Sequence, residues 1–145
     1  MSKSTLLENN KVNTKIKLAG LWITLMLLYI YGDFFSLMTP DRIQNLINGK
    51  MGLGTTTPIK LLIASILMAV PALMVSLCLS QKTSINRVLN IIFGFFYTLV
   101  MMLVVYTSIS YWMTFYVFLG VLEIIISLII VWTAWKWPKI EESIV

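Results

Sequence analysis

The chain has 145 residues, of which 59% are apolar and only 12% are charged, and its mean hydropathy is +0.88. A soluble domain is usually about half apolar and about a quarter charged, so this composition excludes an ordinary water-soluble fold and indicates that most of the chain contacts lipid. There is no His, and Cys78 is the single cysteine, so no disulfide can form within one chain and we expect no metal or cofactor.

Four apolar runs are each long enough to cross a bilayer as a helix. The hydrocarbon core is about 30 Å thick and requires about 20 helical residues, and open strands would leave backbone polar groups unpaired in lipid. In chain order we expect a polar tail over residues 1–17, spans over residues 18–38, 59–79, 88–107 and 113–135, and a second tail over residues 136–145. The sequence therefore predicts an all-α, four-helix membrane bundle that forms a single domain over residues 1–145.

The first span is followed by the only sizeable loop, residues 39–58. Asp41 and Gly49 are typical of a helix start and a helix end, which predicts a short helix over DRIQNLIN. Its apolar residues share one face, so we expect this helix to rest on the membrane surface between the first two spans. The glycines that follow fit no nucleotide-binding spacing. The later loops, SQKTSINR and SISYW, are short, which makes the third and fourth spans antiparallel neighbours.

Lys and Arg are distributed unevenly between the two sides of the predicted bundle. Eight lie on the side of the two tails: Lys3, Lys11, Lys15, Lys17, Lys82, Arg87, Lys136 and Lys139. Three lie on the other side: Arg42, Lys50 and Lys60. Because basic residues collect on the cytoplasmic side, both termini are predicted to be cytoplasmic, and the net charge of +5 reflects topology rather than nucleic-acid binding. The aromatic residues expected at the inner interface are Trp22, Trp132, Trp135 and Trp137.

Each predicted span carries small or polar residues at helical spacing. In chain order they are Tyr29, Gly32, Asp33 and Ser36; Ser65, Ala69, Ala72, Ser76 and Ser80; Asn86, Asn90, Gly94, Tyr97 and Thr98; and Tyr116, Gly120, Glu123, Ser127 and Ala134. Steps of three and four place each set along one helix face. Membrane helices associate through small and polar residues, so we expect these faces to turn inward. Pro71 is expected to kink the second span, either as a hinge or as static shape.

Asp33 and Glu123 are the only acids well inside the spans, where a charge costs roughly 2.5–3.5 kcal/mol. At 1.5 Å per helical residue, Asp33 should lie about 7–8 Å below the outer surface and Glu123 about 15 Å below it. The residues expected near the two acids are Tyr29, Ser65, Thr98, Tyr116 and the long side chain of Lys60. Together with Asp33 and Glu123 they form the predicted intramembrane polar or ion site.

Both acids have a structural and a functional interpretation. A neutral Glu123 could donate a hydrogen bond to another helix or across a dimer, whereas a Glu123 that loads and unloads a proton or a cation would serve transport. Asp33 could form a helix-end ion pair or an interhelical hydrogen bond. Alternatively, the two acids could face one acidic pocket that is open to the outside and receives a cation or a small amine.

The segments LWITLMLLYIYGDFFSLMTP (residues 21–40) and EIIISLIIVWTAWKWP (residues 123–138) resemble an uncharacterised family of small four-span bacterial membrane proteins. The residues that carry this resemblance are Trp22, Tyr29, Tyr31, Asp33, Ser36, Pro40 and the end from Glu123 to Trp137. The resemblance covers nearly the whole chain and implies a bacterial inner-membrane protein, with no activity to carry over. The layout is also similar, in span number and size alone, to DoxX-like four-helix membrane proteins.

Three functions are compatible with these features. The lack of His, of a cysteine pair and of any recognised motif favours a non-enzymatic accessory or structural bundle. The alternative is a small proton- or cation-coupled transporter or channel that uses Asp33 and Glu123. Four helices enclose little volume, so such a path would form within a homo-oligomer. An enzyme is least favoured, because two carboxylates could do acid–base chemistry but no nucleophile accompanies them. The expected partners are the bilayer, a second copy or another membrane protein.

Overall fold

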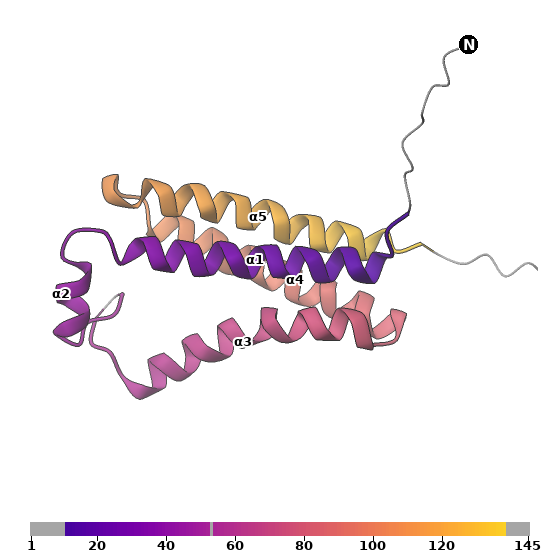
Figure 1. Cartoon of the computed structure of the whole chain (residues 1–145), viewed down its shortest axis with the longest axis horizontal. Helices are drawn as coiled ribbons and strands as arrows, with labels where there is room; N and C mark the ends of the chain where they lie inside the picture. Colours follow the sequence, from indigo (N-terminus) through magenta and orange to yellow (C-terminus); the bar gives the residue numbers. More distant parts are fainter. Residues whose placement is uncertain (1–10, 53, 139–145) are drawn as a thin grey trace, which may run out of the picture.

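The computed structural model describes residues 11–52 and 54–138 of the chain. In chain order the elements of this part are α1 (Thr14–Ser36), α2 (Arg42–Ile47), α3 (Pro58–Ser80), α4 (Thr83–Thr107), the short 3-10 helix η1 (Tyr111–Met113) and α5 (Thr114–Trp135). The four long helices lie side by side, and each is long and apolar enough to cross a membrane (Figure 1). The predicted all-α fold with four spans is confirmed.

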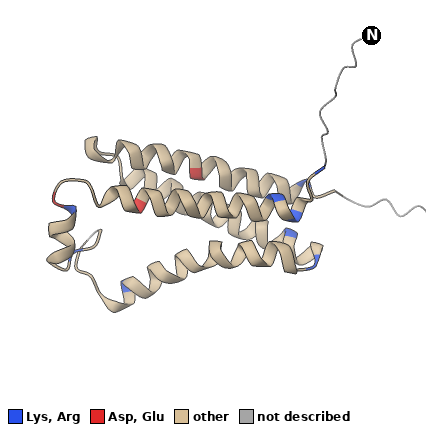
Figure 2. Ribbon diagram, in the orientation of Figure 1, with Lys and Arg blue, Asp and Glu red and all other residues tan. Residues whose placement is uncertain are grey.

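The bundle has two ends that differ in charge. Thr14, Ser80, Thr83 and Trp135 lie at one, which we call the termini end, and α2 lies at the other, the α2 end (Figure 1). Figure 2 shows most Lys and Arg residues at the termini end. Two residues of the predicted asymmetry, Lys3 and Lys139, lie outside the described residues, as do residues 1–10 and 139–145 of the predicted tails. The orientation of the bundle in the membrane stays a prediction.

Two helices begin earlier than hydropathy predicted. α1 begins at Thr14 rather than at residue 18, because the side chain of Asn13 accepts a hydrogen bond of 2.9 Å from the backbone N–H of Lys15 and caps the helix. α4 begins at Thr83, where a loop was expected up to Arg87. Hydropathy marks the part of a helix that lies in lipid, and polar residues at its margin remain helical. The surface helix α2 lies within the predicted DRIQNLIN segment.

Glycines allow α5 to approach its two neighbours closely. A Cβ at Gly94 of α4 would lie 2.8 Å from Cγ2 of Val131 and 3.3 Å from Cγ2 of Ile130, so only glycine permits this approach of α4 to α5. At Gly32 of α1 a Cβ would lie 3.4 Å from the ring of Tyr116 in α5. α1 also packs against α3, whereas α3 and α4 touch at few positions. α5 therefore packs closely against α1 and α4, whereas α3 and α4 pack less closely against each other.

α3 bends at Pro71, and its first half leans away from the other helices (Figure 1). Proline has no N–H, so the carbonyl of Leu67, four residues earlier, has no partner within the helix. The hydroxyl of Tyr97 in α4 donates a hydrogen bond of 2.5 Å to this carbonyl. The buried residues of α3, which are Pro71, Met74 and Cys78, all lie at or after the bend. The bend therefore leaves the α2 end of α3 exposed.

The small-residue face of α3 does not turn inward as predicted. Its members Ser65, Ala69, Ala72, Ser76 and Ser80 are all exposed. Nearly every residue of α3 is apolar, so hydropathy does not distinguish its faces. The inward face is instead the one that carries the Leu67 carbonyl and Cys78, because polar side chains of α4 bind there.

A polar cluster joins three helices near the termini end. Trp22 Nε1 of α1 donates a hydrogen bond of 2.7 Å to Asn90 Oδ1 of α4, and Asn90 Nδ2 donates one of 2.6 Å to Asn86 Oδ1. Asn86 Nδ2 in turn donates to the carbonyl of Cys78, in the last turn of α3, at 2.5 Å. Trp22 was predicted at the membrane interface but is fully buried, because Asn90 offers its ring N–H a partner inside the bundle.

Candidate functional site

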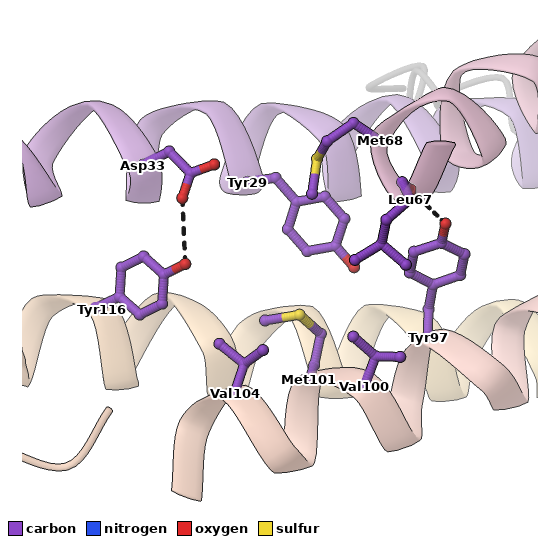
Figure 3. A pocket seen from close by; sticks show the side chains of 9 residues that line it. All are labelled: Tyr29, Asp33, Leu67, Met68, Tyr97, Val100, Met101, Val104 and Tyr116. Atoms are coloured by element: carbon purple, nitrogen blue, oxygen red, sulfur yellow. Dashed lines mark hydrogen bonds between the residues drawn. The ribbon is translucent and has the colours of Figure 1, made fainter. Parts of the chain in front are cut away.

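Asp33 of α1 and Tyr116 of α5 meet in the half of the bundle that adjoins the α2 end. The Tyr116 hydroxyl donates a hydrogen bond of 3.2 Å to Asp33 Oδ1 (Figure 3). The neighbouring Gly32 packs against the Tyr116 ring, and a Cβ at this position would lie 3.4 Å from the ring, an ordinary van der Waals distance. Asp33 is itself exposed rather than buried. The structure thus brings together two of the residues that the sequence placed in one site.

A cavity lies next to this pair and is lined by all four long helices (Figure 3). The lining residues are Tyr29, Asp33, Leu67, Met68, Tyr97, Val100, Met101, Val104 and Tyr116. The space open to the centres of water molecules is about 60 Å³. One water needs about 10–15 Å³ by this measure, so the cavity has room for about four to six waters. It combines one carboxylate, three tyrosines and an otherwise apolar wall.

Tyr29 lies one helical turn before Asp33 on the same face of α1. Its side chain is 7% exposed, and its hydroxyl is buried without a hydrogen-bond partner in residues 11–52 and 54–138. The ring packs against that of Tyr97, with 6.4 Å between the ring centroids. Leaving a buried hydroxyl unpaired costs about 1–3 kcal/mol. Tyr29 lines the cavity, so its unpaired hydroxyl lies on a residue of the cavity wall.

Glu123 of α5 is the most deeply placed acid of the described chain. It is 3% exposed, and its Oε2 atom is buried with no partner among the residues that the structure describes. It lies two helical turns from Tyr116, on the same face of α5. The ionisable side chains around its carboxyl include Asp33, Tyr29 and Tyr116. Glu123 does not line the cavity, so only Asp33 opens on it directly.

Three residues of the predicted site lie elsewhere. The Thr98 hydroxyl bonds to the Ser127 hydroxyl at 2.8 Å instead of to Glu123, because Ser127 faces it from α5. Lys60 Nζ donates to the carbonyl of Thr55 at 2.8 Å, and Ser65 Oγ donates to the carbonyl of Leu61 at 2.8 Å. The last two belong to the first half of α3, which leans away from Asp33. Asp33, Tyr116 and Tyr29 thus lie around one cavity, with Glu123 two turns from Tyr116 along α5, and the role of these residues as a site stays a prediction.

Two residues of the site region were missed by sequence reasoning. Tyr97 was assigned to an inward face but not to the site, although Pro71 implies an unpaired carbonyl that some side chain must satisfy. Arg42, rather than Lys60, is the cation whose charge acts on Asp33. Arg42 lines a second, larger pocket of about 430 Å³ at the α2 end. Tyr116 lines both spaces and therefore separates this outer pocket from the inner cavity.

The described ranges contain no group of three or more His, Cys, Asp or Glu side chains placed to hold a metal ion. The polar groups of the cavity are instead a single carboxylate and phenol hydroxyls. Such groups accept and donate hydrogen bonds and attract positive charge. The chemistry within reach is therefore the binding of a proton or a cation.

The fold and this site define a four-span helical membrane protein with an acidic cavity in one half of the bundle. The chain belongs to the family described as "Family of unknown function (DUF6326)", whose model matches residues 6–143. No curated protein and no solved structure matches the chain. The predicted membership of an uncharacterised family is thereby confirmed, while the bacterial origin and the DoxX-like similarity stay predictions.

Proposed function

We propose that this multi-pass membrane protein moves protons or other small cations across the membrane by means of Asp33 and Glu123. One observation carries the proposal: the Oε2 atom of the buried Glu123 has no partner among the described residues, whereas the buried side chains of Trp22, Asn86 and Asn90 bond to one another or to a carbonyl. A glutamate that only joined helices would bond across an interface. An unpaired acid inside a membrane is by default a functional group, because it is costly to keep.

The geometry supports a route from the α2 end toward Glu123. Tyr116 lines the outer pocket, and the hydrogen bond from Tyr116 to Asp33 lies beside the cavity. Between Glu123 and the termini end lie the hydrogen bond that joins Thr98 to Ser127 and the polar cluster that contains Trp22 and Asn90. Glu123 itself lines neither the outer pocket nor the cavity, so a proton or an ion would need a local movement on the α2 side to reach it. Release to the other side would require a movement, for which the bend of α3 offers a hinge.

The proposal includes an orientation: both termini are cytoplasmic, and the α2 end faces outward from a bacterial inner membrane. The excess of Lys and Arg at the termini end supports it. A membrane-impermeant maleimide applied to intact cells should label a Lys50→Cys variant, which lies near α2. It should label a Lys82→Cys variant only after the cells are broken. The reverse pattern would overturn the orientation.

Ion flux into proteoliposomes tests the transport proposal. Purified full-length protein is reconstituted with an internal pH dye, and a potassium diffusion potential drives protons inward, with uptake of radioactive sodium or rubidium measured in parallel. We expect flux with the unmodified protein and none with Glu123→Gln. Ser65→Ala is the matched control, because Ser65 is exposed and bonds only within its own helix. Equal flux in Glu123→Gln, or no flux of any ion with the unmodified protein, would contradict the proposal.

A second candidate function is that of a non-enzymatic accessory or structural bundle, and the outward small-residue face of α3 favours it. Small residues at steps of three and four permit close approach of another membrane helix, from a second copy or from a different protein. Ala69→Cys in native membranes should then form disulfide-linked dimers, whereas Phe118→Cys on the exposed face of α5 should not. Equal cross-linking at both positions would count against a specific interface. Neither candidate function is enzymatic.

A further inference from the structure

We infer that the cavity beside Asp33 binds a small organic cation, an alkylammonium or guanidinium ion of up to about six non-hydrogen atoms. The inference rests on the proposed function, because it names the kind of cation that the same site would take. Three features carry it: the size of the cavity, the chemistry of its wall, and a lining tyrosine, Tyr29, whose buried hydroxyl has no partner among the described residues.

The volume limits the size of the ligand. The cavity holds about 60 Å³ for water-sized centres, which corresponds to about four to six waters and a similar number of ligand atoms. Pockets for drug-sized molecules are several times larger, about 300–1,000 Å³ by common measures. A cation with several rings therefore does not fit unless α3 moves away further. Ions of the size of ethylammonium, guanidinium or tetramethylammonium do fit.

The wall favours an organic cation over a metal ion. Calcium and magnesium ions require about six or more oxygen ligands, counting waters. The cavity offers few oxygens, and the Tyr97 hydroxyl is already bonded to the Leu67 carbonyl. Five of its nine lining residues are aliphatic or thioether side chains, namely Leu67, Met68, Val100, Met101 and Val104. Methyl and methylene groups of an organic cation would pack against this apolar surface, whereas the water shell of a hydrated metal ion would make no apolar contact with it.

The polar groups are placed to recognise a positive charge. Tyr116 holds Oδ1 of Asp33 and leaves the second carboxylate oxygen free to accept an N–H donor (Figure 3). The aromatic rings of Tyr29, Tyr97 and Tyr116 attract cations through their faces. The unpaired Tyr29 hydroxyl, on a side chain that is 7% exposed, can accept a second N–H donor. An ion with several N–H groups would satisfy both acceptors at once.

Arg42 is the one cation facing this region from the described loop, and it does not line the cavity. It lines the outer pocket, which Tyr116 also lines. The contact between α3 and α4 is sparse, and residues of both helices line the cavity. An organic cation that has partitioned into the bilayer could therefore enter between α3 and α4 without passing Arg42.

Equilibrium binding of radiolabelled methylammonium and guanidinium to the purified full-length protein in lipid nanodiscs tests the inference. We expect saturable binding of both ions. Urea, the neutral molecule with the shape of guanidinium, should compete at least about tenfold more weakly, because it lacks a charge-assisted bond to Asp33. Tetrapropylammonium should compete at least about tenfold more weakly than tetramethylammonium, because a fully packed cavity cannot take the added methylenes. Absent saturable binding, or equal competition by urea, would overturn the inference.

Variants locate the bound ion. Asp33→Asn should weaken methylammonium binding at least about tenfold, and Tyr29→Phe should weaken it less, by about three- to tenfold, because a neutral hydrogen bond is weaker than one to a carboxylate. Ser65→Ala should leave the affinity unchanged. A thermal unfolding measurement on each variant in the same nanodiscs confirms that it is folded. Unchanged binding in a folded Asp33→Asn variant would overturn the inference.

The outcome for this inference is separable from that for the proposed function. If ion flux depends on Glu123 while methylammonium and guanidinium do not bind, transport stands and the organic-cation site is wrong. If both ions bind in a manner that depends on Asp33 while no ion crosses the membrane, the binding site stands and the transport proposal is wrong.

Discussion

At the termini end, the buried side chains of Trp22, Asn86 and Asn90 form hydrogen bonds that link three helices. By contrast, the Tyr29 hydroxyl and Glu123 Oε2, which lie closer to the α2 end than this cluster, have no partner among the described residues. Both regions belong to the same four helices and carry a similar supply of polar residues. The difference lies in what the helix ends offer. The last turn of α3 presents free carbonyls, and Asn86 binds the one at Cys78 while Lys15 binds the one at Gln81, at 2.6 Å.

The comparison shows how one bundle can combine a stable part with a site that is costly to fold. Membrane helices gain little from apolar burial against each other, so polar bonds and close packing hold them together. The termini end supplies these bonds, together with the contact of α4 with α5 at Gly94. The α2 end can then keep an acid and a hydroxyl unpaired, as functional sites often do at the expense of stability.

The largest expected effect is at Asn90, which joins Trp22 to Asn86. Asn90→Ala should lower the free energy of unfolding by about 3 kcal/mol, because it leaves the buried N–H of Trp22 unpaired and removes the bonds of Asn90 to Cys78 Sγ and to Asn86. Reversible unfolding in mixed detergent and lipid measures this loss. Thr24→Val is the control, because Thr24 is exposed and bonds only to Gly20 in its own helix. A loss below about 1 kcal/mol in Asn90→Ala would remove the contrast between the two halves.

An effect of opposite sign is expected at Glu123. Glu123→Leu should raise the free energy of unfolding by about 1–2 kcal/mol, because an unpaired buried carboxyl is replaced by an apolar side chain. The same unfolding measurement applies, and ion flux should disappear in parallel. A stability gain together with a loss of flux would sharpen the distinction between a stable half and a functional half. Destabilisation instead would show that Glu123 has a structural partner.

A smaller effect is expected at Tyr97, which ties the bent helix α3 to α4. Tyr97→Phe should lower the free energy of unfolding by about 1 kcal/mol, because the carbonyl of Leu67 loses its donor. Hydrogen exchange should become faster in residues 58–70 and stay unchanged near Cys78. The matched control is Tyr31→Phe, since Tyr31 is 54% exposed. If exchange rises equally at both ends of α3, the bend is not the place where its two halves separate.

The structure brings Tyr29 and Asp33 together as expected, because local spacing carries this part of the information. Tyr29 and Asp33 are one turn apart in any helix, and so lie on one face whatever the fold. The position of Tyr116 opposite Asp33 follows from the antiparallel arrangement of α1 and α5. Lys60 and Ser65 were misplaced because their position depends on the bend of α3, whose direction sequence spacing does not contain. The orientation of the small-residue face of α3 was predicted wrongly for the same reason.

The sequence by itself determined the fold class, the four spans and the uneven charge of the two ends, because these depend on hydropathy, length and composition. Only the tertiary structure decided which face of α3 turns inward, that Trp22 is buried, and which acid remains unpaired. Those outcomes depend on which polar groups meet between helices. In a chain that is apolar on nearly every face, a few interhelical hydrogen bonds set the packing, and one sequence does not reveal which of them form.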